Sequence, residues 1–297
     1  MDKRKEESLQ HIFEKIQHGI LLEEKRASKN NFIWNFYRTA AAILLIPVLT
    51  FSVWYYTNSI SSKYTAEVEH IEQAWVEINA PDGARVQFSL PDGSSGWLNS
   101  GAKLRYPSIF NRHRRVELTG EAYFEVRHRD STEFIVSIPD MDIKVLGTKF
   151  NVSAYASDSF SDVVLKEGKV EIKGKADSFN HRLIPGEKIN FNRETKSLNL
   201  YSVDANRYTA WKDGYLIIEN ENLGQIVGRI ERWYNVDIII KDKKLMNYRF
   251  KATFKDEPLE EVLRLLAKST PIKHRIQERK MNSNGVLLKR VVTIESK

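Results

Sequence analysis

The stretches LPDGSSGWLNSGAKLRYP (residues 90–107) and RRVELTGEAYFEV (residues 114–126) decide the fold of the middle of this chain. In the second stretch, apolar residues occupy alternate positions, which is the period of a strand with one buried face. The first stretch contains the turn Pro-Asp-Gly at 91–93, where the access of glycine to positive φ favours a hairpin. The alternating apolar residues are Val116, Leu118, Ala122 and Phe124.

The same alternation extends from about residue 75 to residue 195. Another Pro-Asp-Gly turn lies at 81–83, and Glu167-Gly168 and Pro185-Gly186 separate later runs. No helical period interrupts these runs. We therefore expect an all-β antiparallel domain over residues 75–195 and a linker over residues 196–210.

The C-terminal part contains an internal repeat, in which Leu223 maps to Leu259, 36 residues later. An amphipathic helix and a strand over 236–241 are followed by a second helix that begins near Pro258, a residue suited to a first turn. His274 opposite Ile238 breaks the match, and a chance alignment of amphipathic helices is the alternative. The repeat predicts a small α/β domain of two β-α-β units over residues 211–297. The other matched pairs are Leu216 and Ala252, Ile218 and Phe254, Ile226 and Val262, Val227 and Leu263, Ile230 and Leu266, Val236 and Ile272, and Ile240 and Ile276.

An uncharged run from Thr39 to Tyr56, which continues to Ser62, precedes the β region. Its length suits a helix that spans about 30 Å of hydrocarbon, and aromatic residues flank both ends. Basic residues are denser before the run than after it, so the positive-inside rule predicts a cytoplasmic tail over 1–38 and a periplasmic C-terminus. We expect a transmembrane helix over 39–58 in the inner membrane and a linker over 59–74; a cleaved signal peptide is the alternative.

An apolar stripe lies in the predicted cytoplasmic tail, with apolar residues three and four positions apart. Its residues are Leu9, Ile12, Phe13, Ile16 and Ile20. A helix this short cannot bury the stripe by itself. Acidic and basic residues are balanced around it, which favours a protein partner over the alternative, a helix lying on the membrane surface.

Composition excludes several classes of function. The formal charge of +7 comes from 46 basic and 39 acidic residues that are interspersed, so no nucleic-acid-binding face is expected. The absence of cysteine excludes disulfides and thiolate sites, and the seven scattered histidines have no metal-ligand spacing. Glu121 and Glu125 share the solvent side of a strand with Tyr123, and we interpret them as solvated surface. We expect no cofactor, no metal and no ordinary enzymatic activity.

Four further motifs follow the two quoted above along the chain: FIVS (134–137), VLGTKFNV (145–152), VVLKEGKVEI (163–172) and LIPGEK (183–188). These six motifs stand in the order found in FecR proteins, and over residues 80–188 the chain resembles the FecR family of transmembrane anti-sigma factors. From Trp211 to Ser296 it resembles the C-terminal domain of Bacteroidetes-type FecR-like proteins, and the repeat resembles the short N-terminal domain of secretins and TonB-dependent receptors. The tail is shorter than the tryptophan-bearing domain of some relatives, which leaves open whether the chain inhibits or activates.

The resemblance implies a regulator that relays a signal from an outer-membrane TonB-dependent transducer to a cytoplasmic extracytoplasmic-function sigma factor. The stripe of the tail would bind the sigma factor. The strand with Val236, Ile238 and Ile240 would bind the signalling domain of the transducer if it is an edge strand, and an internal strand is the alternative. A different function is also open, that of a membrane-anchored structural or assembly protein that docks on a secretin-like complex.

The motif VLGTKF contains Gly147 and Thr148, and relatives in the family cleave their own backbone between a glycine and a threonine. The hydroxyl of Thr148 would attack the carbonyl of Gly147 and convert the peptide into an ester that water opens. A bulge or bend between two strands is the structural alternative for the same residues.

Overall fold

The computed structural model describes residues 47–57, 74–110, 114–175, 178–283 and 285–297, and the chain divides into two units, Met1–Glu72 and Gln73–Lys297. In the first unit, residues 47–57 are helical and exposed. Within the described ranges, no helix combines the length and the apolar character needed to cross a membrane. The remainder of the span expected over 39–58 lies outside the described residues.

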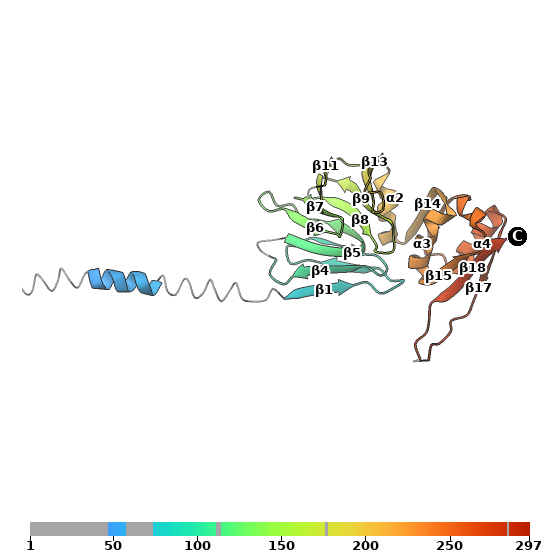
Figure 1. The fold of residues 1–297 in the computed structure, drawn as a ribbon, viewed down its shortest axis with the longest axis horizontal. Helices are drawn as coiled ribbons and strands as arrows, with labels where there is room; N and C mark the ends of the chain where they lie inside the picture. The colour runs from blue at the N-terminus through green and yellow to red at the C-terminus, as the bar shows by residue number, and fades with distance from the viewer. Residues whose placement is uncertain (1–46, 58–73, 111–113, 176–177, 284) are drawn as a thin grey trace, which may run out of the picture. The chain divides into compact units, whose positions relative to one another are not determined.

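The described part of the second unit begins with a β domain of 13 strands, which covers residues 75–202 (Figure 1). Its strands are β1 (Trp75–Asn79), β2 (Val86–Ser89), β3 (Ser95–Leu98), β4 (Lys103–Pro107), β5 (Arg114–Glu125), β6 (Phe134–Ser137), β7 (Met141–Val145), β8 (Lys149–Ala154), β9 (Phe160–Glu167), β10 (Val170–Gly174), β11 (Asn180–Leu183), β12 (Glu187–Asn192) and β13 (Leu198–Ser202).

Strand β5 takes part in two sheets. Its first half pairs with β4 and β6, and its second half pairs with β3 and β8. One sheet therefore has the order β1-β4-β5-β6-β7-β10-β11, and the other has the order β2-β3-β5-β8-β9-β12-β13. The pairing of β5 with β6 is parallel, and the other described pairs of this domain are antiparallel. The expectation of an all-β domain is confirmed, with one parallel pair in place of a fully antiparallel arrangement.

Gly120 marks the point at which β5 passes from one sheet to the other. Its φ is +96°, and a Cβ atom at this position would lie 2.6 Å from the Cα atom of Ala102. Only glycine adopts this backbone without strain and also leaves room for the neighbouring chain. The sheet can therefore curl around a single core.

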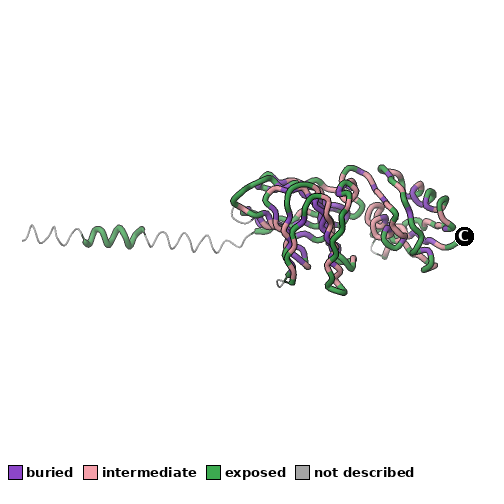
Figure 2. Tube along the Cα trace, turned by 90° about the horizontal axis from the view of Figure 1, so that it is seen from above, coloured by how far each residue is buried: buried purple, intermediate pink, exposed green. Residues whose placement is uncertain are grey.

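The core of the β domain consists of the residues that alternate inward along its strands, and Figure 2 shows buried and exposed segments interleaved there. Phe124 of β5 stacks on Phe150 of β8 with ring centroids 5.2 Å apart, and it meets Phe134 of β6 edge-on at 6.2 Å. Aromatic pairs in these geometries stabilise a core beyond the area that they bury. The four alternating residues of β5 named from the sequence are all buried.

The linker expected over 196–210 was wrong. Strand β13 pairs with β12 along five residues and completes one sheet, and helix α2 (Ala205–Thr209) follows it. Most side chains of β13 are exposed, so the strand carries no alternating apolar signal and is held by backbone hydrogen bonds.

The C-terminal domain, residues 215–296, contains the two repeat units predicted from the sequence. Equivalent positions are buried in both units, with Leu223 matching Leu259 and Val236 matching Ile272. The first unit is β14 (Tyr215–Asn222), α3 (Leu223–Tyr234) and β15 (Val236–Ile240), and the second is β16 (Arg249–Lys255), α4 (Leu259–Ser269) and β17 (Ile272–Ile276). A 3-10 helix, η3 (Lys243–Asn247), connects them.

The two units share their sheets in different ways. Their first strands, β14 and β16, pair directly as an antiparallel ribbon. Their last strands do not pair, because β18 (Arg290–Ser296) lies between them, parallel to β15 and antiparallel to β17. The repeat could not predict β18, since this strand has no counterpart in the other unit.

Candidate functional site

The β domain meets the C-terminal domain at a polar contact that we call the interdomain joint, formed by Arg85, Asn151, Tyr155, Trp211 and Arg232. Trp211 lies in the short 3-10 helix η2 (Ala210–Asp213) between the two domains and is 7% exposed. Its indole Nε1 donates a hydrogen bond to Oδ1 of Asn151 on β8, at 3.0 Å. A buried indole N–H needs such a partner, so this bond sets the orientation of the ring.

Arg85 connects the loop before β2 to three groups on the other side of the joint. Its Nη1 donates to the backbone carbonyl of Trp211 at 2.8 Å, and its Nη2 pairs with Asp256 at 3.1 Å. The guanidinium also lies over the ring of Trp233, 4.5 Å from the centroid. Arginine suits this position because its planar group can donate in plane and stack on an aromatic face.

Arg232 of α3 makes the corresponding connection from the C-terminal domain. Its Nη1 donates to Asp158 at 3.0 Å, and its guanidinium lies 4.2 Å from the centroid of the Tyr155 ring. Arg193 holds this loop in place, since its Nη1 donates to the carbonyl oxygens of Tyr155 and Asp158 at 2.6 and 2.7 Å. Arg232 therefore binds a surface that is already ordered within the β domain.

Glu121 lies directly behind the joint, and the expectation that it is solvated surface was wrong. Its Oε1 accepts from the amide of Asn151 at 2.9 Å, and its Oε2 accepts from the amide of Asn99 at 2.8 Å. Burial raises the pKa of this carboxyl group, while the two amide bonds and the charge of Arg232 oppose the shift. Glu121 itself is half-buried, and Tyr123, on the same face of β5, is buried.

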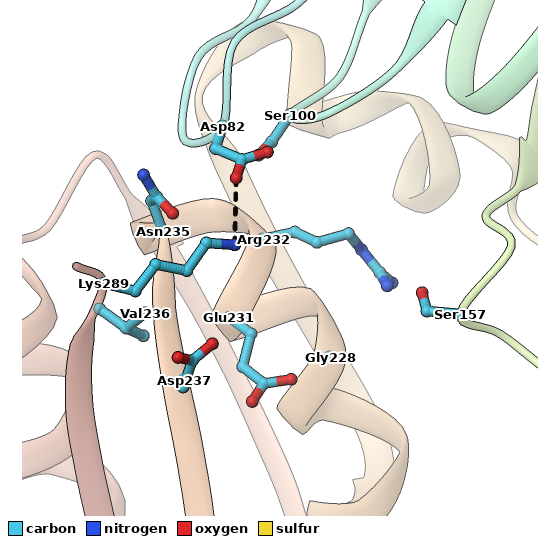
Figure 3. A pocket seen from close by; sticks show the side chains of 10 residues that line it. All are labelled: Asp82, Ser100, Ser157, Gly228, Glu231, Arg232, Asn235, Val236, Asp237 and Lys289. Atoms are coloured by element: carbon cyan, nitrogen blue, oxygen red, sulfur yellow. Dashed lines mark ion pairs between the residues drawn. The ribbon is translucent and has the colours of Figure 1, made fainter. Parts of the chain in front are cut away.

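A small polar cavity of about 170 Å³ opens beside the joint (Figure 3). Lys289 crosses it from the C-terminal domain and pairs with Asp82 of the β domain at 3.1 Å. Within the described ranges, no three His, Asp or Glu side chains are arranged to hold a metal ion. The remaining lining residues are Ser100, Ser157, Gly228, Glu231, Arg232, Asn235, Val236 and Asp237.

Comparison with known proteins relates both domains to one family. Residues 76–171 match the family described as FecR protein, and residues 215–282 match the family described as FecR, C-terminal. Two crystal structures of a candidate anti-sigma factor from Parabacteroides distasonis ATCC 8503, at 1.65 and 2.50 Å resolution, are similar to this chain with a TM-score of 0.65. Sequence identity is 31% and 32%, and the alignments cover 75% and 74% of this chain and 99% of each relative. No curated protein matches the chain.

The chain belongs to the FecR family of anti-sigma regulators. In this FecR-family chain, Arg85, Asn151 and Tyr155 lie in the FecR segment, and Arg232 lies in the FecR C-terminal segment. Trp211 stands between the two matched segments. The interdomain joint is therefore where the two FecR segments contact each other.

The predicted cleavage site, Gly147-Thr148, forms the bend between β7 of one sheet and β8 of the other. Thr148 is buried, and its Oγ1 donates to the carbonyl of Lys169 at 2.9 Å. Gly147 packs so closely on His128 that a Cβ atom would lie 2.5 Å from Nδ1 of that ring. These contacts explain why a glycine occupies this tight bend. Self-cleavage of this FecR-family chain stays a prediction.

Strand β15, predicted to bind a transducer, lies at an edge of its three-stranded sheet. Val236 is buried, and Ile238 and Ile240 pack against the core of the domain, so these three side chains do not face a partner. The exposed apolar side chain of the strand is Ile239. Docking at this edge stays a prediction, and the backbone with Ile239 is the surface that the edge offers.

Glu231 of α3 occupies part of this edge, because its Oε1 accepts a hydrogen bond from the backbone N–H of Ile238 at 2.7 Å. A carboxylate on an outward N–H is one way in which proteins block unwanted strand pairing. A partner strand would have to displace Glu231.

The five stripe residues of the tail lie outside the described residues. Sequence reasoning missed the joint altogether, since its partners are distant in the chain; Arg85 and Trp211 are 126 residues apart. The available signal was weak: a tryptophan and two arginines in polar surroundings occur on many surfaces.

Proposed function

We propose that this FecR-family chain is a single-pass regulator of the inner membrane that relays a signal from an outer-membrane TonB-dependent transducer to an extracytoplasmic-function sigma factor. The tail over 1–38 would bind the sigma factor in the cytoplasm, and the unit over 73–297 would meet the transducer in the periplasm. The observation that carries the proposal is the presence of both FecR segments in one unit behind an uncharged, aromatic-flanked run.

The composition of the run over 39–58 supports a membrane span. Its described residues, 47–57, are helical, and their large apolar side chains, among them Phe51, Val53 and Trp54, are exposed. An exposed helix of this composition is unfavourable in water and suits hydrocarbon. The basic residues before the run favour the orientation with the N-terminus inside.

The interdomain joint supports a relay through the second unit. Arg85 and Arg232 each combine an ion pair with an aromatic stack across the joint, so displacement of the C-terminal domain must break several contacts together. A transducer bound to the C-terminal domain would therefore act on the β domain as well. A flexible connection would not transmit such an effect.

The sigma-binding part is tested with a tagged tail, residues 1–38, co-expressed with an extracytoplasmic-function sigma factor encoded beside this protein. We expect the native tail to retain the sigma factor and the triple variant Ile12→Asp, Phe13→Asp, Ile16→Asp to lose it, because the new charges would have to be desolvated at the interface. Aspartates on the opposite helical face, at His11 and His18, serve as the control. Unchanged binding by the triple variant would contradict the proposal.

The topology is tested with a reporter enzyme that is active only in the periplasm, fused after Lys297. We expect activity, since the basic residues lie before the span. An inactive reporter together with an active cytoplasmic reporter would overturn the membrane arrangement. A periplasmic C-terminus in a chain that binds no sigma factor but does bind a secretin-like complex would instead support the assembly function.

A further inference from the structure

The hairpin that connects β17 to β18 extends beyond the body of the C-terminal domain (Figure 1). Backbone hydrogen bonds order it almost to its end, and Gly285, with φ of +76°, takes part in the turn. The bonds run from Leu288 N to Lys280 O at 2.8 Å and from Asn282 N to Val286 O at 2.9 Å. The end of this hairpin is therefore held by backbone hydrogen bonds and one antiparallel bridge, while its large apolar side chains are exposed.

Four large apolar side chains form what we call the hairpin tip: Met281, Val286, Leu287 and Leu288, which are 64%, 58%, 55% and 49% exposed. Leu287 stands opposite Met281 in an antiparallel bridge. Neighbours in an extended chain point to opposite faces, so Leu287 faces one side while Val286 and Leu288 face the other. The hairpin tip is apolar on both sides, whereas a hairpin lying along a protein surface would need one apolar side only.

Basic residues stand directly behind the hairpin tip on both strands. Lys289 pairs with Asp82, and Arg290 pairs with Glu260 at 2.8 Å. Arg279 and Lys280 are exposed and form no ion pair with a described residue; Glu278 is their acidic neighbour. An apolar end with cationic groups behind it matches the cross-section of a bilayer surface, where acyl chains lie beneath anionic headgroups.

We propose that the hairpin tip inserts into the interfacial layer of an anionic lipid bilayer, with Arg279 and Lys280 at the headgroup phosphates. This inference rests on the proposed function, which places the unit over 73–297 beside the inner membrane. The 16 residues over 59–74 limit its distance from the span to at most about 55 Å when fully extended. The tether keeps the tip at a high local concentration near lipid, so weak insertion is enough to orient the unit.

The test uses residues 73–297, because this unit has its own two cores and because relatives that crystallised correspond to about this share of the chain. The chain has no cysteine, so Leu287→Cys supplies a single site for an environment-sensitive fluorophore. Vesicles contain phosphatidylethanolamine and phosphatidylglycerol, or phosphatidylcholine alone. We expect a blue shift of the label and partitioning at least tenfold stronger with the anionic vesicles. The control carries the same fluorophore on Ile184→Cys, at an exposed position of the β domain, and the emission of this label should not shift with either kind of vesicle.

Two variants separate the apolar and the cationic contributions. Val286→Asp combined with Leu287→Asp should reduce vesicle binding at least tenfold, whereas Ile184→Asp should leave it unchanged. Arg279→Gln combined with Lys280→Gln should reduce binding to anionic vesicles and its dependence on salt. If the native unit, the aspartate variant and the glutamine variant all bind anionic vesicles equally, the proposal is overturned.

The remaining outcomes distinguish lipid from protein. If the label at position 287 stays in water with both kinds of vesicle, the lipid proposal is overturned. This holds even if the same label shifts when the signalling domain of a transducer is added, because the hairpin tip would then bind protein and not lipid. The result of the vesicle assay depends neither on binding of a sigma factor nor on the orientation of the chain in the membrane. Failure of the proposed function would appear in the reporter and pull-down experiments, and failure of this inference would appear only with vesicles.

Discussion

The guanidinium of Arg232 lies 4.2 Å from the ring centroid of Tyr155, and through this stack α3 of the C-terminal domain is attached to the β domain. The same side chain pairs with Asp158. Both partners belong to one loop, which Arg193 orders from within the β domain. One arginine thus connects two domains whose cores are separate.

Replacement of Arg232 by alanine should loosen this attachment. We expect the free energy of unfolding of residues 73–297 to fall by about 1–3 kcal/mol, because a cation–π contact and a partly buried ion pair are both lost. Urea unfolding should then separate into two transitions. Arg264→Ala is the matched control, since Arg264 is exposed and, among the described residues, forms its ion pair with Glu261 of the same helix, and its effect should stay within about 0.5 kcal/mol. Equal effects of the two variants would mean that the joint does not couple the domains.

Trp211→Phe should reduce the free energy of unfolding by about 1–3 kcal/mol, because Oδ1 of Asn151 would lose its buried donor while most of the ring packing is kept. Trp75→Phe serves as the control, since Trp75 lies in β1 away from the joint and is 42% exposed. Denaturant unfolding followed by circular dichroism measures both. A loss no larger than that of the control would show that the bond adds little to the joint.

Stability should depend on pH through Glu121. Burial raises its pKa, so the folded protein holds the proton more tightly than the unfolded chain. The stabilising contribution is therefore complete below the ordinary value of 4.5 and is lost as pH rises through the folded-state pKa. In Glu121→Gln this loss is absent, so the difference in unfolding free energy, native minus variant, should decrease above pH 4.5 and level off once the pH exceeds the folded-state pKa of Glu121. Carboxyl groups common to both proteins, such as Asp142, cancel in the difference. A difference that does not change with pH would refute the assignment.

Self-cleavage should break the bond between Gly147 and Thr148. The Thr148 oxygen forms a bond to the Gly147 carbon, the C–N bond breaks, and the hydroxyl proton passes to the new amine; water then opens the ester. We expect two fragments in mass spectra of the purified unit, absent in Thr148→Ala and present in Thr148→Ser. The sample must be denatured first, because β7 and β8 each pair with two strands and would hold the fragments together. An intact native chain after long incubation would leave Gly147 as a bend alone.

If a transducer strand adds to the edge of β15, Glu231→Ala should strengthen its binding several-fold, because the backbone N–H of Ile238 is then free. Ile239→Asp should weaken binding, whereas an aspartate at Leu200, an exposed position on β13, should not. Surface plasmon resonance with the isolated signalling domain measures all three. Binding that is indifferent to Glu231 and Ile239 would move the docking site elsewhere on the domain.

Local patterns were sufficient for much of the fold. The alternation along β5 predicted its buried face because side-chain direction in a strand depends only on the backbone period. The 36-residue offset predicted both repeat units because each unit carries its own helix stripe and flanking strands. β18 and β13 were missed for the opposite reason, since neither has a repeat partner or an alternating signal.

The sequence by itself therefore determined the two domains of this FecR-family chain and the inward face of most of their elements. Only the tertiary structure decided that Glu121 is half-buried and bound by two amides, that Trp211 and Arg232 fasten the domains, and that β15 is an edge strand partly blocked by Glu231. A strand's period states which residues share a face but not what covers that face. Covering depends on contacts between residues far apart in the chain, and these form only when both domains have folded and come together.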